Sequence, residues 1–148
     1  YQILLAKSRD NARTPMQWND KPYAGFSDVK SWIEPIYNYK DINVEKNLED
    51  QDSVFYYYQK LIQLRKQYQV ISLGTYEPLL SDHPTLYAYK RQYQDQEIIV
   101  YNHFYGDQTT SISIDATQYD ILLSNVNRQT LENEMMLKPY ESLVLIKK

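Results

Sequence analysis

The sequence contains no cysteine and only three glycines among its 148 residues. Without cysteine there is no disulfide and no thiolate metal site, and this composition favours a cytoplasmic location. Three isolated glycines exclude a glycine-rich loop of the kind that cradles phosphate groups. The two histidines have no metal-binding spacing. The residues therefore indicate neither a metal nor any other cofactor.

Long apolar runs and a strong excess of charge are also lacking. The longest uncharged apolar runs are much shorter than the roughly 20 residues of a membrane helix, so we expect no membrane partner. The net charge is −3 and no basic block is present, so we expect no nucleic-acid partner. The chain begins with Tyr1 rather than methionine, and we expect it to belong to a longer polypeptide.

Tyrosine, in contrast, is abundant, with 16 copies. Its ring is apolar and its hydroxyl is polar, which suits strand faces and interfaces. Most of the tyrosines fall in segments with helix or strand patterns, so we interpret them as core or half-buried residues. Stacking of the rings on sugars is the alternative, and it would make the chain a stand-alone carbohydrate-binding or interaction module.

The pattern of residues divides the chain into two parts. Residues 1–52 show no lasting periodicity, which indicates a long functional loop within a larger fold. Residues 53–69 have apolar side chains at helical spacing, and Asp52 or Ser53 is a suitable N-cap, which predicts a helix. A boundary is expected near residues 72–75.

After residue 75 the apolar period changes from that of a helix to two, the period of a β-strand. Strands are predicted at residues 75–80, 85–93, 97–104, 110–114, 119–124 and 140–147, with a weaker seventh within 128–136. A spacing of about 10–12 residues is typical of an antiparallel sandwich or barrel. We therefore expect an α+β chain that ends in an all-β domain.

Carboxylates are common in the sequence, but none is marked out as catalytic. Glu49, Asp50 and Asp52 precede the expected helix, where they complement its dipole and cap it. No nucleophile elbow or metal-binding helix motif occurs. The chain alone therefore shows no catalytic constellation.

One stretch stands out, SRDNARTPMQW at residues 8–18, with two arginines four residues apart. The guanidinium fork suits a carboxylate, a phosphate or paired hydroxyls, and it stays charged when buried. Arg9 and Arg13 are therefore candidates for substrate binding. The alternative is an internal pair with Asp10 that fixes the loop.

This stretch closely resembles a segment of glycoside hydrolase family 13, the α-amylase clan, in its oligo-1,6-glucosidase-like branch. Further similar motifs are AGF at 24–26, SWI at 31–33, NYKDINV at 38–44, DSVFYYYQKLIQLRK at 52–66 and LKPYES at 137–142. Within the branch, the first motif, GTYEPLL at 74–80 and NHFYG at 102–106 are most similar to trehalose-6-phosphate hydrolases. Oligo-1,6-glucosidases and dextran glucosidases are the next most similar.

The resemblance implies that the chain is the C-terminal portion of a retaining α-glucosidase. Residues 1–72 would be the end of a (β/α)8 barrel, a long loop plus the last helix, and residues 75–148 a β-sandwich domain. The catalytic carboxylates would lie in the preceding barrel of the same polypeptide. The substrate would be an α-glucoside, either trehalose 6-phosphate or an isomalto-oligosaccharide. The resemblance further implies that Arg13 binds hydroxyls of the terminal glucose and that Arg9 supports it.

Overall fold

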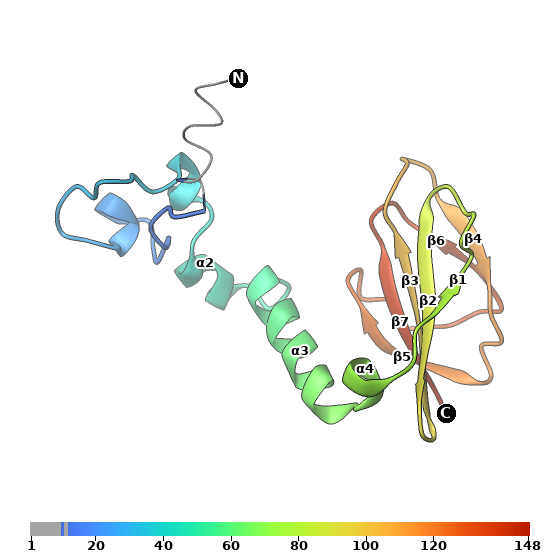
Figure 1. Cartoon of the computed structure of the whole chain (residues 1–148). Coiled ribbons are helices and arrows are strands. Elements are labelled where there is room, and N and C mark those ends of the chain that lie inside the picture. The colour runs from blue at the N-terminus through green and yellow to red at the C-terminus, as the bar shows by residue number, and fades with distance from the viewer. Residues whose placement is uncertain (1–9, 11) are drawn as a thin grey trace. The chain divides into compact units, whose positions relative to one another are not determined.

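The computed structural model describes residue 10 and residues 12–148 (Figure 1). Contacts between residues divide the chain into two compact units that meet between Leu61 and Ile62, inside helix α3 (Val54–Gln67). Residues 72–75, where the sequence places a boundary, lie at the change from helix α4 (Val70–Leu73) to strand β1 (Glu77–Leu79). Nowhere in the described residues is there a helix of the length and apolarity that crossing a membrane requires.

The first unit consists mostly of irregular chain around short helical turns. Two 3-10 turns, η1 (Pro22–Gly25) and η2 (Tyr37–Lys40), precede the short helix α2 (Val44–Glu49). The sequence predicted no regular element before residue 53, and α2 corrects that expectation. The helix begins where it does because Asn43 is its N-cap, with a side chain that accepts a hydrogen bond from the Lys46 amide at 2.9 Å.

Helix α3 confirms the helix that the sequence predicted over residues 53–69. Its last turn carries Arg65 and Lys66, where the helix dipole favours cations. None of its residues is buried, and large apolar side chains such as Val54 and Ile62 are 77% and 44% exposed. The apolar face that the sequence predicts is thus uncovered.

The second unit contains the predicted strands, including the weak seventh. All pairs are antiparallel, in a five-stranded sheet of order β1-β2-β3-β7-β5 and a two-stranded sheet of β4 and β6 (Figure 1). The strands are β1 (Glu77–Leu79), β2 (Leu86–Tyr93), β3 (Gln96–His103), β4 (Thr110–Ser113), β5 (Tyr119–Ser124), β6 (Glu134–Leu137) and β7 (Ser142–Lys147).

The main core of this unit lies between the two sheets. Alternate residues of a strand point to opposite faces, so Leu86 and Ala88 of β2 turn toward the two-stranded sheet, which contributes Ile112 and Leu137. These side chains are at most 6% exposed. The arrangement confirms the antiparallel β-sandwich that the sequence predicted.

A short helix, α4 (Val70–Leu73), packs on the other face of the five-stranded sheet (Figure 1). Val70 is fully buried there against Ile98 and Val100 of β3. Arg91 of β2 donates hydrogen bonds to the carbonyls of Ile71, at 2.8 Å, and Gly74, at 2.6 Å. Because carbonyls at the end of a helix lack partners within the helix, these bonds fix α4 to the sheet.

A buried ion pair closes the turn before β7. The Glu141 carboxylate is fully buried and accepts hydrogen bonds from the Arg128 guanidinium, at 2.7 and 3.1 Å, and from the Lys138 amide, at 2.9 Å. Burial raises the pKa of Glu141, but the hydrogen bonds and the positive charges of Arg128 and Lys138 outweigh it and hold the pKa below its ordinary value. The pair is therefore charged at neutral pH.

Candidate functional site

One of the two candidate arginines, Arg13, lies on the loop of residues 12–18. Arg9 lies outside the described residues. Arg13 is exposed, and its amide donates a 3.0 Å hydrogen bond to the carbonyl of Asp10, which forms a turn. No ion pair joins the Arg13 guanidinium to a carboxylate in the part of the chain that the structure describes.

The loop is held in place by the N-terminus of α2. The first amides of a helix have no partner within the helix. Here the amides of Val44 and Glu45 donate to the carbonyls of Gln17, at 2.9 Å, and Trp18, at 3.0 Å. The polypeptide just after Arg13 thus supplies the acceptors that α2 needs, and the helix fixes the loop in return.

Two amide side chains extend this support. The Gln17 amide donates to the Asn38 side chain at 3.1 Å and to the carbonyl of Ile42 at 2.8 Å. Asn43, which is 3% exposed, donates to the carbonyl of Tyr39 at 2.8 Å while it caps α2. We assign both as positioning residues, and sequence reasoning missed them. The available signal was Asn43 directly before Val-Glu-Lys, a typical N-cap with an acidic residue in the first turn.

The segment after Trp18 folds back in an unusual conformation. The amides of Trp18 and Asn19 both donate to the carbonyl of Ala24, at 2.9 and 3.2 Å. Three successive residues, Tyr23, Ala24 and Gly25, have φ of 55°, 59° and 65°. A Cβ on Gly25 would press against the Asn19 side chain, which would have to move, and the positive φ of Gly25 favours glycine there. The loop is held by backbone geometry as well as by hydrogen bonds.

Replacing Gly25 by alanine is expected to loosen this turn by about 1–2 kcal/mol, because a side chain is strained at positive φ. Hydrogen exchange at the Trp18 and Asn19 amides should then become roughly 10-fold faster or more. Gly106→Ala is the control: Gly106 also has positive φ, but it lies in the second unit, where its Cβ would meet only Thr85 at 3.4 Å. Unchanged exchange in Gly25→Ala would contradict this account.

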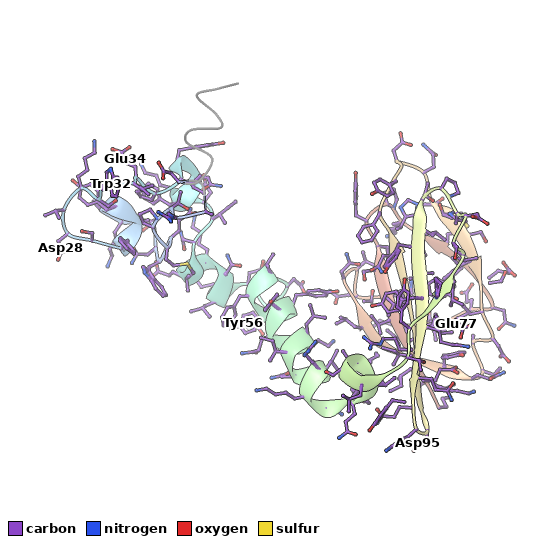
Figure 2. The ribbon with its side chains drawn as sticks, in the orientation of Figure 1. Asp28, Trp32, Glu34, Tyr56, Glu77 and Asp95 are labelled. Carbon is purple, nitrogen blue, oxygen red and sulfur yellow. The ribbon has the colours of Figure 1, made fainter. Side chains whose placement is uncertain are left out.

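The rest of the first unit offers surfaces for contact rather than groups for chemistry. Trp32 and Tyr37 are 93% and 91% exposed. Glu34, which lies near Trp32 (Figure 2), pairs with Lys30 at 2.6 Å. A hollow of about 380 Å³ beside the loop is lined mainly by apolar side chains, among them Met16, Ile42 and Phe55. Within the described residues, no group of three His, Asp or Glu side chains could hold a metal ion. Among the described residues, Arg13 is the candidate for ligand binding that the sequence singled out.

Comparison with known proteins agrees with the motifs. The model of the alpha amylase catalytic domain matches residues 1–74. The chain is 45% identical, over 96% of its length, to the trehalose-6-phosphate hydrolase of Bacillus subtilis and 43% identical, over 98%, to the oligo-1,6-glucosidase of Halalkalibacterium halodurans. The crystal structure of Bacillus licheniformis trehalose-6-phosphate hydrolase superposes on 99% of the chain, with a TM-score of 0.85 and 43% identity.

These proteins are much longer than the chain. The chain covers 26% of the Bacillus subtilis trehalose-6-phosphate hydrolase and 27% of the Halalkalibacterium halodurans oligo-1,6-glucosidase. It covers 28% of the Bacillus licheniformis enzyme. It thus spans about a quarter of the length of the relatives that it matches.

Proposed function

The chain belongs to the alpha-amylase family, and on this premise we propose that it forms the C-terminal portion of a retaining α-glucosidase that hydrolyses trehalose 6-phosphate. The products would be glucose and glucose 6-phosphate. The observation that carries the proposal is the similarity of nearly the whole chain to trehalose-6-phosphate hydrolase, of which it covers 26%. Residues 1–72 would complete a (β/α)8 barrel, and residues 75–148 would form the β domain.

The exposed apolar side chains of the first unit support the proposal that another part of the protein packs against it. Both buried apolar clusters lie in the second unit, whereas the first leaves Met16, Trp32, Ile42, Val54 and Phe55 exposed. Four of these side chains, Met16, Ile42, Val54 and Phe55, line the same hollow, and an exposed apolar surface of this kind indicates an interaction site. In the proposed protein the preceding part of the barrel covers this surface, which includes the hollow beside the loop and the face of α3.

The residues present in the chain suit substrate binding, and the catalytic carboxylates belong to another part of the proposed enzyme. Retaining glycosidases use one carboxylate as a nucleophile that forms a covalent glycosyl-enzyme and a second as acid and then base. We place both on the preceding barrel. Arg13 would bind hydroxyls of the terminal glucose, with Arg9 in support, because loops at the C-terminal face of a barrel build its active site. The reaction needs no cofactor, and a cytoplasmic location belongs to the same proposal.

A second substrate class has nearly equal support. The oligo-1,6-glucosidase of Halalkalibacterium halodurans is 43% identical over 98% of the chain, close to the 45% of the trehalose-6-phosphate hydrolase. The alternative substrate is therefore an isomalto-oligosaccharide. Groups that read a substrate phosphate would lie mainly on barrel loops that precede this chain.

The test begins with the native polypeptide. An antibody raised to the 148-residue chain should detect a protein several hundred residues longer in a lysate of the source cells, enough to add most of a barrel of about 250 residues. That protein should hydrolyse trehalose 6-phosphate faster than isomaltose, and the 148-residue chain alone should hydrolyse neither. Faster hydrolysis of isomaltose would favour the alternative substrate. Turnover by the chain alone, or a band at 148 residues, would overturn the proposal, and the latter would favour a binding module.

A further inference from the structure

The two histidines of the sequence, His83 and His103, lie at the two ends of one hydrogen-bonded network in the second unit. His83 is half-buried in the turn before β2, and His103, which is 1% exposed, is the last residue of β3. Between them lie the hydroxyls of Thr85, just before β2, and Thr110, the first residue of β4. We call these four residues the histidine network.

Three contacts connect the network across the sandwich. The Nε2 atom of His103 lies 2.9 Å from the hydroxyl of Thr110, and this hydroxyl lies 3.2 Å from that of Thr85. The hydroxyl of Thr85 lies 3.5 Å from Nδ1 of His83. Because β3 belongs to the five-stranded sheet and β4 to the two-stranded sheet, the network joins the two sheets.

The backbone of the turn fixes the protonation state of His83. Its Nδ1 atom accepts hydrogen bonds from the amides of Leu86, at 3.1 Å, and Thr85, at 3.3 Å. A ring nitrogen accepts only through its lone pair, so Nδ1 carries no proton and the proton of the neutral ring is on Nε2. A second proton on Nδ1 would replace this acceptor by a donor that faces two other donors. The turn before β2 therefore requires neutral His83.

The surroundings of His103 also require a neutral ring. Its Nδ1 atom is buried and has no hydrogen-bond partner among the described residues. Because buried N–H groups without a partner are rare, we place the single ring proton on Nε2, which donates it to the hydroxyl of Thr110. A proton added to Nδ1 would bring a buried charge without an acceptor, which costs free energy.

The donors of the network then all run in one direction. His103 donates to the hydroxyl of Thr110, and that hydroxyl donates to the hydroxyl of Thr85. The Thr85 hydroxyl in turn points its proton toward the lone pair of His83. Each hydroxyl thus accepts one hydrogen bond and donates another, and this order needs both histidines to be neutral.

Within the described residues, no charged side chain forms an ion pair with either ring. The turns at this end of the sheet carry Asp82, Asp107, Lys138 and Glu141. Glu141 pairs instead with Arg128. On the side of the sheet to which His103 points, the charged residues lie toward the other ends of their strands, and they are Lys90, Glu97 and Lys147. Tyr101, two residues before His103, stays neutral because burial raises its pKa.

We propose that the histidine network is an acid-sensitive switch in the β domain, closed while both histidines are neutral and opened by protonation of His83. Histidine ordinarily changes its charge between pH 5 and 8. The unfolded chain accepts protons that the closed network excludes, so the domain loses stability as the pH falls through this range. The amides of Thr85 and Leu86 lose their acceptor, so the turn before β2 is where the domain opens.

The test compares urea unfolding of the 148-residue chain at pH 7.5 and pH 5.5 with that of His83→Asn. Histidine in an unfolded chain titrates near pH 6.5, so each proton that the fold excludes should raise the unfolding equilibrium constant about 10-fold between these two pH values. Asparagine does not titrate, and its side-chain oxygen accepts from a backbone amide two residues on, as in an Asx turn. His83→Asn should therefore make the rise about 10-fold smaller.

The matched control is Asp82→Asn, which removes the charge next to His83 and leaves both histidines in place. This variant should keep the full rise of the unfolding constant between pH 7.5 and pH 5.5. An equal rise in His83→Asn and in the original chain would overturn the proposal.

Nitrogen-15 NMR of the two rings provides a measurement that needs no variant and decides the matter if His83→Asn does not fold. At pH 7.5 both rings should carry their proton on Nε2, and at pH 5.5 the protection of the Leu86 amide from hydrogen exchange should be at least 10-fold lower. The Thr117 amide, which the Asp115 carboxylate accepts at 3.1 Å in another turn, should keep its protection because the pKa of Asp115 is lowered by its hydrogen bonds. A proton on Nδ1 of neutral His83, or unchanged protection of Leu86 once His83 is charged, would overturn the proposal.

Discussion

Replacing Arg13 by alanine in the long polypeptide is expected to lower kcat/KM for its glucoside substrate about 10- to 100-fold. A hydrogen bond that involves a charged group contributes about 1.5–3 kcal/mol, which corresponds to a loss of this size in transition-state binding. The side chain is exposed and its loop is fixed by α2, so the substitution removes the guanidinium without removing a structural contact of the described residues. The measurement is steady-state kinetics with trehalose 6-phosphate, and KM should rise.

Two comparisons make this result specific. Arg65→Ala removes another exposed arginine, in the last turn of α3, and should leave kcat/KM unchanged. Arg13→Lys keeps the positive charge but loses the planar fork, so it should recover only part of the activity if paired hydroxyls are the ligand. If Arg13→Ala has normal kinetics and Arg9→Ala does not, the binding role belongs to Arg9.

Replacing Arg128 by methionine is expected to lower the free energy of unfolding of the β domain by about 3–5 kcal/mol. The substitution leaves the fully buried Glu141 carboxylate without its cation, and an uncompensated buried charge is strongly destabilising. It also removes the hydrogen bond to the carbonyl of Met136 at 2.8 Å. Urea unfolding at pH 7, followed by the near-ultraviolet circular dichroism of the tyrosines, measures the loss.

The control is Lys90→Met, which breaks the pair between Lys90 and Glu77 at 2.9 Å. Glu77 lies on β1 at the edge of the sheet, where it is 56% exposed (Figure 2). An exposed pair of this kind contributes at most about 1 kcal/mol. A loss in Arg128→Met no larger than in this control would contradict the buried pair as a main support of the turn before β7.

The effect of Arg128→Met also depends on pH in a defined direction. Because the pKa of Glu141 is lowered in the folded protein, its charged form stabilises the fold above the ordinary carboxyl pKa of about 4.3. That stabilisation disappears as the pH falls through the lower pKa of the folded state. The difference in stability between the original chain and Arg128→Met should therefore shrink in acid, and a constant difference would exclude ionised Glu141 as its source.

The sequence predicted the elements whose signals are local. Residues 85–93 and 97–104 are rich in aromatic and β-branched side chains and are separated by a turn signal, and each forms a strand within one residue of the expected bounds. The first strand is shorter than predicted, with Pro78 at its centre, as fits an edge strand that pairs on one side only. The short α2 was missed because a large part of its support is tertiary: carbonyls of Gln17 and Trp18, more than 20 residues earlier, accept its first amides.

Of the candidate site, only the motif that carries Arg9 and Arg13 could be predicted from the sequence. The spacing of Arg9 and Arg13 marked the loop. The N-cap signal at Asn43 was local, but no local pattern indicated that Gln17 and helix α2 hold the loop. The helical period of α3 likewise identified an apolar face without indicating what covers it, because a periodic pattern carries no information about its partner. The exposure of Tyr87 was not predictable either, since an inward and an outward tyrosine in a strand look alike in sequence.

The hydrogen bonds from Arg91 to α4 determine where the β domain can be separated from the preceding part of the chain. A cut at residues 72–75 follows the change from helix to strand, yet it would discard Val70, which is fully buried against the sheet, and Ile71, whose carbonyl Arg91 binds. The sheet would lose its cover and Arg91 would lose its acceptors. An independently folding β domain should therefore begin before Tyr68, with the last turn of α3 retained as part of the domain.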